Sequence, residues 1–434
     1  MSNACGVDFG TSNSTVGWIA PTNGPVSAQR TLLTLEDGKP TLPSVVFFNA
    51  DDDAVTYGRA ALADYLAGYE GRLMRSLKSL LGTSLIDGQT EVGGRALPFR
   101  MLLAHFIGEV KRRGERAAGH AFEAAVFGRP VFFIDDSAAA DQLAEDTLAE
   151  IARSVGFKHV AFQYEPIAAA FDYESRMDRE ELVLIVDIGG GTSDFSLVRL
   201  GPQRAAKAER REDILATGGV HIGGTDFDKY LSLASVMPLL GYGSRMNNNS
   251  EIPSGYYFNL ATWHTINQAY TKKTWTQLAD VVRDAAEPAK LVRLQRLIEE
   301  RAGHWLAMQV EEGKIALSAA PAVRLELARL APPAVVDLTR GGFDDAIDHL
   351  LGSIDATVVR MLADAQVAPA AVDTVFFTGG SSGVLALRER IGRLLPAAKK
   401  VEGDLFGSIG SGLAIDAQRK FGTSGLSGAS GPAA

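Results

Sequence analysis

Short runs of apolar and β-branched residues recur along the chain and predict strands. The runs are bounded by glycine, proline, asparagine and charged positions, which is typical of strands buried in a sheet. The predicted strands cover residues 6–9, 16–19, 44–48, 131–134, 182–187, 195–200 and 374–378.

Helical periodicity, with apolar residues at every third or fourth position, fills much of the sequence between these runs. The predicted helices cover residues 60–66, 101–113, 138–154, 225–234, 291–317, 343–365 and 385–395. Ser137 and Thr225 stand where a hydroxyl side chain can cap the first turn of a helix. A polar stretch at 241–255 is expected to be a loop. Because strands and helices alternate, we predict an α/β protein.

The composition is that of a folded, multidomain protein. The chain has 434 residues, of which 46% are hydrophobic and 22% charged, and roughly 150 residues per domain gives two or three domains. A formal charge of −9 argues against nucleic acid or a membrane as partner. The apolar stretch 182–186 is too short for a bilayer span, and Asp8 interrupts any signal peptide, so we expect a cytoplasmic protein. The single cysteine, Cys5, excludes disulfide frameworks and cysteine-ligated metal sites.

A glycine-containing hairpin pattern occurs twice. The first copy is residues 6–14, with the sequence GVDFGTSNS, and the second is residues 186–195, with the sequence VDIGGGTSDF. In each copy an apolar run ends at an aspartate, Asp8 or Asp187, and glycine, threonine and serine lead into a second β-rich run. The two copies are too far apart for a solenoid repeat, so they indicate duplicated halves.

Chemistry gives a reason for two such hairpins. A glycine turn leaves backbone N–H groups exposed, and such groups bind phosphate together with nearby hydroxyls. An aspartate at the strand end would repel phosphate, but it can hold the waters of a phosphate-bound Mg²⁺. Either hairpin alone is most simply an ordinary turn, whereas two facing copies would hold a polyphosphate and its metal from both sides. The Gly-Lys pairs at 38–39 and 313–314 lack the rest of a P-loop, and residues 189–194 do not fit a dinucleotide fingerprint.

A series of motifs resembles the nucleotide-binding domain of the seventy-kilodalton heat-shock chaperones, in the actin/hexokinase-like ATPase superfamily. The resemblance implies a two-lobed, ribonuclease-H-like duplicated fold with a nucleotide cleft between the lobes. Within the family, the sequence is most similar to the YegD-like chaperone-like proteins, which lack a peptide-binding domain. The motifs lie at 8–12, 78–82, 165–170, 187–194, 223–228, 311–318, 378–383 and 407–414.

The resemblance also implies a role for individual residues. ATP or ADP and Mg²⁺ are the implied cofactors, with Asp8 and Asp187 holding the metal through water. The implied catalytic residues are Lys78, Glu165, Asp187 and Asp194. Residues implied to bind the phosphates are Gly10, Thr11, Ser12, Asn13, Gly189, Gly190, Gly191, Thr192, Gly223 and Gly224. Residues implied to bind adenosine are Glu311, Lys314, Ser318, Gly379, Gly380, Ser381 and Gly383.

Some positions depart from the family pattern. Gly383 stands where the family usually has an adenine-stacking arginine, and Ile315 replaces a basic residue after Lys314. Residues 241–304 fit the family poorly, and we expect their aromatic side chains to pack in a core, with an exposed partner surface as the alternative. The sequence ends about where the family's nucleotide-binding domain ends, so we expect no peptide-binding domain.

The implied function is an ATP-binding, slowly hydrolysing chaperone-like switch that works with an unidentified protein client or co-chaperone. Two alternatives remain open, a small-molecule kinase of the same superfamily and an actin-like filament-forming ATPase. The expected organisation is lobe I at 1–178 with 399–421 returning to it, and lobe II at 179–398 with a divergent subdomain at 225–304. Residues 422–434 are expected to form a flexible tail.

Overall fold

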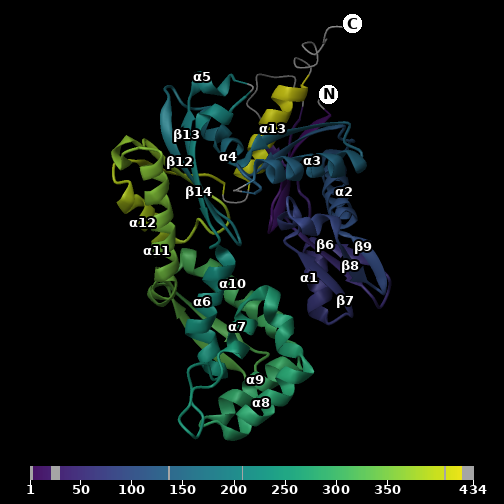
Figure 1. Cartoon of the computed structure of the whole chain (residues 1–434), viewed down its shortest axis with the longest axis vertical. Helices are drawn as coiled ribbons and strands as arrows, with labels where there is room; N and C mark the ends of the chain where they lie inside the picture. The colour runs from purple at the N-terminus through teal and green to yellow at the C-terminus, as the bar shows by residue number, and fades with distance from the viewer. Residues whose placement is uncertain (1–2, 21–29, 135–136, 208, 405–406, 423–434) are drawn as a thin grey trace.

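Two large sheets organise the computed structural model, which describes residues 3–20, 30–134, 137–207, 209–404 and 407–422 (Figure 1). The first sheet has the order β11-β10-β1-β2-β3, with β4 also paired to β2, and the second has the order β14-β13-β12-β17-β18. The first sheet consists of β1 (Ala4–Phe9), β2 (Asn13–Ile19), β3 (Arg30–Leu32), β4 (Leu42–Pro43), β10 (Ala124–Arg129) and β11 (His159–Tyr164). The second consists of β12 (Glu181–Ile188), β13 (Ser193–Leu200), β14 (Ile214–Val220), β17 (Thr374–Thr378) and β18 (Lys399–Glu402).

The two sheets share one topology. In each, an antiparallel hairpin, β1–β2 or β12–β13, is extended on one side by an antiparallel strand and on the other by two parallel strands. The predicted duplicated, two-lobed α/β fold is therefore confirmed. We call the elements around the first sheet lobe I and those around the second sheet lobe II.

Helices cover both sheets and extend lobe II. Lobe I has α1 (Gly58–Ala67), α2 (Phe99–Ala118), α3 (Ala138–Ser154) and α4 (Glu165–Glu174). Lobe II has α5 (Pro202–Ala205), α6 (Gly224–Leu231), α7 (Gly255–Ala261), α8 (Lys272–Asp284), α9 (Pro288–Glu299), α10 (Gly303–Ala319), α11 (Arg340–Asp364) and α12 (Leu385–Leu394). Figure 1 shows α8 and α9 at the end of the molecule remote from both termini.

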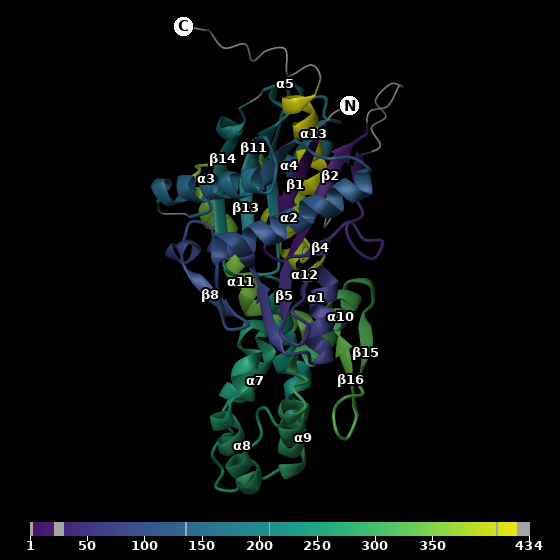
Figure 2. The ribbon, with the colours of Figure 1, turned by 90° about the vertical axis from the view of Figure 1, so that its right-hand side faces the viewer.

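Three small sheets complete the architecture. In lobe I, β5 (Val45–Asn49) pairs with β6 (Val55–Tyr57) and β7 (Gly71–Arg75), and β8 (Gln89–Val92) pairs with β9 (Arg95–Pro98). In lobe II, β15 (Ala322–Leu327) and β16 (Ala334–Thr339) form a hairpin that Figure 2 shows beside α10.

The last helix, α13 (Ser408–Phe421), brings the C-terminal part of the chain back to the N-terminal strands (Figure 1). It packs against α4, β1, β2 and β10, all in lobe I. The return to lobe I therefore begins later than the expected residue 399, because β18 pairs in parallel with β17 in the lobe II sheet. From residue 423 onward, the predicted tail lies outside the described residues.

Most predicted elements form close to their expected positions. Six of the strand runs lie in β1, β2, β5, β12, β13 and β17, and the helix at 138–154 begins where Ser137 accepts a hydrogen bond from the Ala140 N–H at 3.2 Å. The prediction of a strand at 131–134 is wrong. The strand here is β10, which ends before Pro130, a residue with no N–H to donate to a neighbouring strand.

Two helix predictions also need correction. Residues 291–317 form two helices, α9 and α10, because the chain turns at Arg301, which has a left-handed φ of 49°. Thr225 is not an N-cap: Gly223 occupies that position, and the Thr225 hydroxyl instead donates to the Gly190 carbonyl at 2.8 Å.

The aromatic residues of the divergent region mainly pack in the lobe II core. Tyr257 is fully buried, and Tyr256, Trp275 and Trp305 are partly buried against the same core, whereas Phe258 remains 37% exposed. Core packing, the expected explanation for these side chains, is therefore confirmed for most of them. In lobe I, Cys5 of β1 is buried as well.

Candidate active site

The glycine turns of the two hairpins meet between the lobes. A methyl group in place of the Gly190 hydrogen would overlap the Ser12 side chain, so the turn after β12 lies directly against the turn after β1. Because Asp8 and Asp187 stand at the ends of these strands, the turn contact brings the two aspartates to one place. The structure thus joins two motifs that are remote in sequence.

The lobe I turn is held from behind by Ser44, which precedes β5. The Ser44 hydroxyl donates to the Gly10 carbonyl at 2.6 Å, and its backbone N–H donates to the Ser12 carbonyl at 2.9 Å. These two bonds engage the carbonyl groups of Gly10 and Ser12, so they fix the shape of the turn. Thr11 is exposed, and Asn13 starts β2.

The lobe II turn is held by its own backbone and by the start of α6. The Gly189 N–H donates to the Thr192 carbonyl at 2.9 Å, and the N–H groups of Gly224 and Thr225 donate to the carbonyls of Gly189 and Gly190. Gly191 has open space on its side-chain side. The bonds orient the turn so that Gly190 faces lobe I.

Lys78 reaches this place from a short 3₁₀ turn, Leu77–Leu80, that follows β7. Buried Leu77 anchors the turn, and Ser76 before it adopts a left-handed φ of 55°. The Lys78 ammonium forms an ion pair with Glu165, the first residue of α4. Two of the predicted catalytic residues are therefore direct partners.

The electrostatics at this place are dominated by crowded carboxylates. Burial raises the pKa of Asp187 to about 8, and the nearby charges of Asp194, Glu165 and Asp8 act in the same direction. Burial and Glu165 raise the pKa of Asp8 to about 7. Burial alone would lower the pKa of Lys78, but Glu165 and Asp8 together raise it above its ordinary value.

This charge balance fits a divalent cation. Four carboxylates, those of Asp8, Glu165, Asp187 and Asp194, surround a single ammonium, so the cluster carries excess negative charge once Asp8 and Asp187 lose their protons. Carboxylate oxygens are the ligands that Mg²⁺ prefers. In the described part of the chain, no group of three or more histidine, cysteine, aspartate or glutamate side chains is arranged to enclose a metal ion. Asp194 also accepts a hydrogen bond from the Thr192 hydroxyl at 2.8 Å.

The residues expected to bind adenosine lie in two places, on α10 and in the loop after β17. Lys314 of α10 is buried, and its ammonium donates to the Gly224 carbonyl at 3.1 Å and pairs with Asp228 at 2.8 Å. A methyl group on Gly224 would overlap the Ser381 hydroxyl, so α6, α10 and the loop after β17 converge at this point. Glu311 and Ser318 are exposed on the same helix.

The loop after β17 packs against Asp187, one of the two candidate metal-binding residues. Gly379 has a left-handed φ of 83°, and a methyl group there would overlap the Asp187 carboxylate. The Ser381 N–H donates to the Ile188 carbonyl at 3.0 Å. Gly380 and Gly383 belong to the same loop. The adenosine and metal candidates are thus neighbours through β12.

Sequence reasoning missed two residues of this region. Ser44 was assigned only to a strand and Asp228 only to a motif. Asp228 is the partly buried partner of Lys314, and desolvation raises its pKa to about 6. An aspartate two residues after Asp226 in the 223–228 motif, one helical turn beyond the Gly-Gly pair, was the available signal for it.

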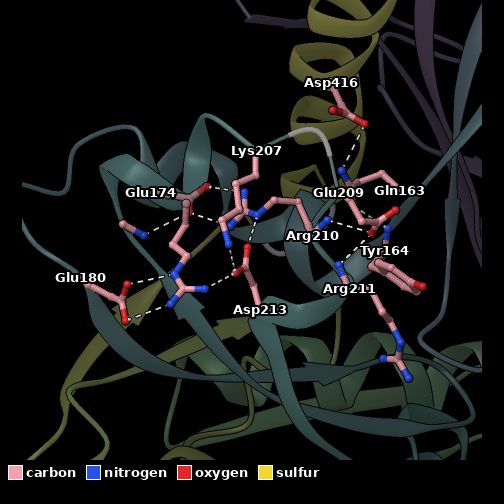
Figure 3. A network of polar contacts seen from close by, with 12 residues as sticks. Gln163, Tyr164, Glu174, Glu180, Lys207, Glu209, Arg210, Arg211, Asp213 and Asp416 are labelled. Carbon is pink, nitrogen blue, oxygen red and sulfur yellow. Dashed lines mark hydrogen bonds and ion pairs between the residues drawn. The ribbon is translucent and has the colours of Figure 1, made fainter.

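A second polar cluster lies at the opposite end of α4 (Figure 3). Arg210 is fully buried, and its guanidinium bonds both carboxylate oxygens of Glu174, the last residue of α4, and also pairs with Asp213. Arg204 pairs with Asp213 at 2.7 Å. A cavity of about 530 Å³ adjoins this cluster, lined in part by Arg210 and Lys420. These ion pairs connect the far end of α4 to lobe II.

Comparison with known proteins identifies the family. The model of the family described as Hsp70 protein matches residues 88–236 and 279–422, which is more than half of the chain. The chain belongs to the Hsp70 family. It therefore has the two-lobed, actin-like ATPase fold of that family. Residues 1–87 lie outside the match, and so do residues 237–278. The second of these gaps covers the first part of the stretch 241–304 that was expected to fit the family poorly, and the match resumes at residue 279, before that stretch ends.

Curated relatives support the assignment. The chain is 27% identical to the chaperone protein HscA of Citrobacter koseri, over 95% of this chain and 58% of that protein. It is 24% identical to the chaperone protein DnaK of Thermosipho africanus, over 87% of this chain and 52% of that protein. The chain spans little more than half the length of these relatives. Within the described ranges, every helix is too short or too polar to cross a membrane.

Proposed function

We propose that this Hsp70-family chain binds ATP and ADP with Mg²⁺ and hydrolyses ATP slowly. The observation that supports the proposal most directly is the meeting of the two hairpin turns, with Asp8 and Asp187 beside the Lys78–Glu165 ion pair. Exposed backbone N–H groups, an ammonium and surplus carboxylates are what a metal-bound polyphosphate requires.

The residues divide the work by their chemistry. In this proposal the turns at Gly10–Asn13 and Gly189–Thr192, with Gly223, hold the phosphates, while Glu311, Lys314, Ser318 and the loop from Gly379 to Gly383 hold adenosine. Lys78 donates to the oxygens on which charge develops, and Glu165 and Asp194 orient the attacking water. Such positioning and charge compensation are the main contributions a protein makes to phosphoryl transfer.

Asp8 and Asp187 would hold Mg²⁺ through its waters. When bound, the ion supplies charge neutralisation at the phosphates. Without it, the buried carboxylates of Asp8 and Asp187 retain protons near neutral pH, as their raised pKa values indicate. Metal binding should therefore release protons, which calorimetry in buffers of different ionisation enthalpy can measure.

We further propose that nucleotide occupancy changes the relation between lobe I (1–178 with α13) and lobe II (179–402, with the divergent subdomain 225–304), and that a protein client or co-chaperone recognises that change. The relatives named above are chaperones by name. Closeness to the YegD-like proteins and a cytoplasmic location remain predictions.

Calorimetry and phosphate release test the proposal. Nucleotide-free protein should bind ADP with Mg²⁺ at one site and release phosphate from ATP in the absence of any small-molecule acceptor. Asp187→Ala and Asp8→Ala should each reduce phosphate release. A folded protein that binds neither ATP nor ADP would refute the proposal, and phosphate release that requires a small-molecule acceptor would favour the kinase alternative.

A further inference from the structure

Arg75 extends from lobe I into lobe II. It is the last residue of β7, whose partner β5 belongs to lobe I, and its backbone pairs with Val45. Its guanidinium carbon lies 4.3 Å from the ring centroid of Trp263, which begins a 3₁₀ segment (Trp263–Tyr270) in lobe II. A guanidinium at this distance over an indole face is held by a cation–π interaction.

The guanidinium lies within the electrostatic field of Glu311, one of the adenosine candidates of lobe II, and of Asp228. Burial lowers the pKa of Arg75, and the carboxylates of Glu311 and Asp228 oppose that lowering. Glu311 lies on α10, and Asp228 is the partner of Lys314 on the same helix. Arg75 is thus a lobe I cation within the field of two lobe II carboxylates, both from the region proposed to bind the nucleoside.

Trp263, the partner of Arg75, belongs to a cluster that a second lobe I residue also contacts. The Tyr65 hydroxyl of α1 donates to the Asn267 carbonyl oxygen at 2.9 Å, and the Tyr65 ring lies 4.9 Å from that of His304. The His304 ring in turn lies 4.8 Å from that of Trp263. Two lobe I side chains therefore contact one continuous aromatic cluster of lobe II.

The nucleoside region of α10 also has an unusual apolar residue. Ile315 is 59% exposed, one turn after Glu311 and one turn before Ser318. Arg75 brings a cation from lobe I into the field of Glu311 on this helix.

We propose that Arg75 is a nucleoside-binding residue supplied by lobe I, which contacts the ribose and base of the nucleotide and not its phosphates. This role rests on the proposed function. A guanidinium offers a flat face that stacks on an aromatic base and a fork of N–H donors for its acceptors. Trp263 orients the guanidinium, and Ile315 offers apolar surface to the base. The nucleoside is consequently bound by both lobes at once.

Affinity for a nucleotide and for its phosphate part alone tests the assignment. Calorimetry with Mg²⁺ should show that Arg75→Ala weakens ADP binding by about tenfold, the effect expected for losing one desolvated cation–π contact. The affinity for inorganic pyrophosphate should stay unchanged. Arg75→Lys should recover part of the loss because it keeps the charge but not the planar fork. The matched control is Arg72→Ala, an exposed arginine of the same strand.

A second variant tests whether Arg75 and Trp263 act together in ADP binding. Trp263→Leu should weaken ADP binding in the same way, and adding Arg75→Ala to it should cause little further loss, since both changes remove one unit. An unchanged ADP affinity in Arg75→Ala, or equal losses for ADP and pyrophosphate, would overturn the assignment. If the wild-type protein itself bound no ADP, the proposed function would fail together with it.

Discussion

Individual side chains at the hairpin turns carry charges that burial alone would not permit. Lys78 is surrounded by Glu165, Asp8 and Asp187, and the charge of Glu165 helps to raise the pKa of each of the other three groups. A buried charge is tolerated only when it is paired, so Lys78 and Glu165 form an ion pair, whereas burial favours the neutral, protonated forms of Asp8 and Asp187. In the proposed function, a bound metal ion would replace the protons of Asp8 and Asp187.

Replacing Lys78 should affect turnover more than binding. In Lys78→Ala, we expect ATP turnover to fall by about a hundredfold or more, because the ammonium acts on charge that develops in the transition state. ADP affinity should change by much less. Single-turnover phosphate release and calorimetry measure the two effects, and Lys158→Ala, which removes an exposed lysine, is the control. Normal turnover with normal binding would make Lys78 a structural residue only.

The raised pKa of Asp187 predicts how stability depends on pH. Its ordinary value is 3.8 and its value in the folded protein is about 8, so the folded state holds a proton that the unfolded state has lost. Stability of the nucleotide-free protein should therefore fall as pH rises from about 4 to about 8. Asp187→Asn should flatten this fall and raise the thermal midpoint at pH 8. The exposed Asp178→Asn serves as control, and an unchanged pH profile in Asp187→Asn would contradict the prediction.

At the scale of elements, sequence patterns predicted best where local signals agreed. The helix at 138–154 and the strand at 374–378 form at the predicted residues, since a Ser137 cap and a fully buried β-branched and aromatic run leave little choice. The strand β10 was missed because its alanines and Gly128 lack β-propensity, and only pairing with β1 and β11 selects it. The contact of Arg75 with Trp263 depends on tertiary structure and has no local signal.

The packing of α13 on α4 depends on one close approach. A methyl group on Gly412 would overlap the backbone carbonyl of Ala168, which cannot move without shifting α4. We expect Gly412→Ala to lower the free energy of unfolding by about 1–3 kcal/mol, as overpacking does. Gly341→Ala, in α11 with open space around it, should cost nothing. Chemical denaturation compares the two, and equal stabilities would show that the helices adjust freely.

At the scale of the whole molecule, the lobes contact each other both at the hairpin turns and around Tyr65. The duplicated halves follow from the repeated motif, whereas the two-lobed fold and the roles of the candidate phosphate and metal residues follow from the family resemblance. The contact around Tyr65 does not follow from the sequence, because Tyr65 meets Asn267 and His304 only when two remote segments of the chain fold together. A ligand that binds both lobes should favour the arrangement in which these contacts persist.

Hydrogen exchange can measure that preference. Adding ADP with Mg²⁺ should slow amide exchange in α1 and in the segment Trp263–Tyr270, which carry the contacting residues. Exchange in the hairpin β15–β16, which contributes none of them, should stay unchanged. Equal slowing everywhere would indicate general stabilisation in place of lobe closure.

The burial of Cys5 gives the molecule a practical property. Cys5 is the single cysteine of the chain, it is only 1% exposed, and burial raises the pKa of its thiol, so it reacts poorly with alkylating reagents. Cysteines introduced at exposed positions, such as Asp52→Cys in lobe I and Gln277→Cys in lobe II, can therefore carry fluorophores without removing the native residue. Energy transfer between such a donor and acceptor would follow the opening and closing of the two lobes in real time, one molecule at a time.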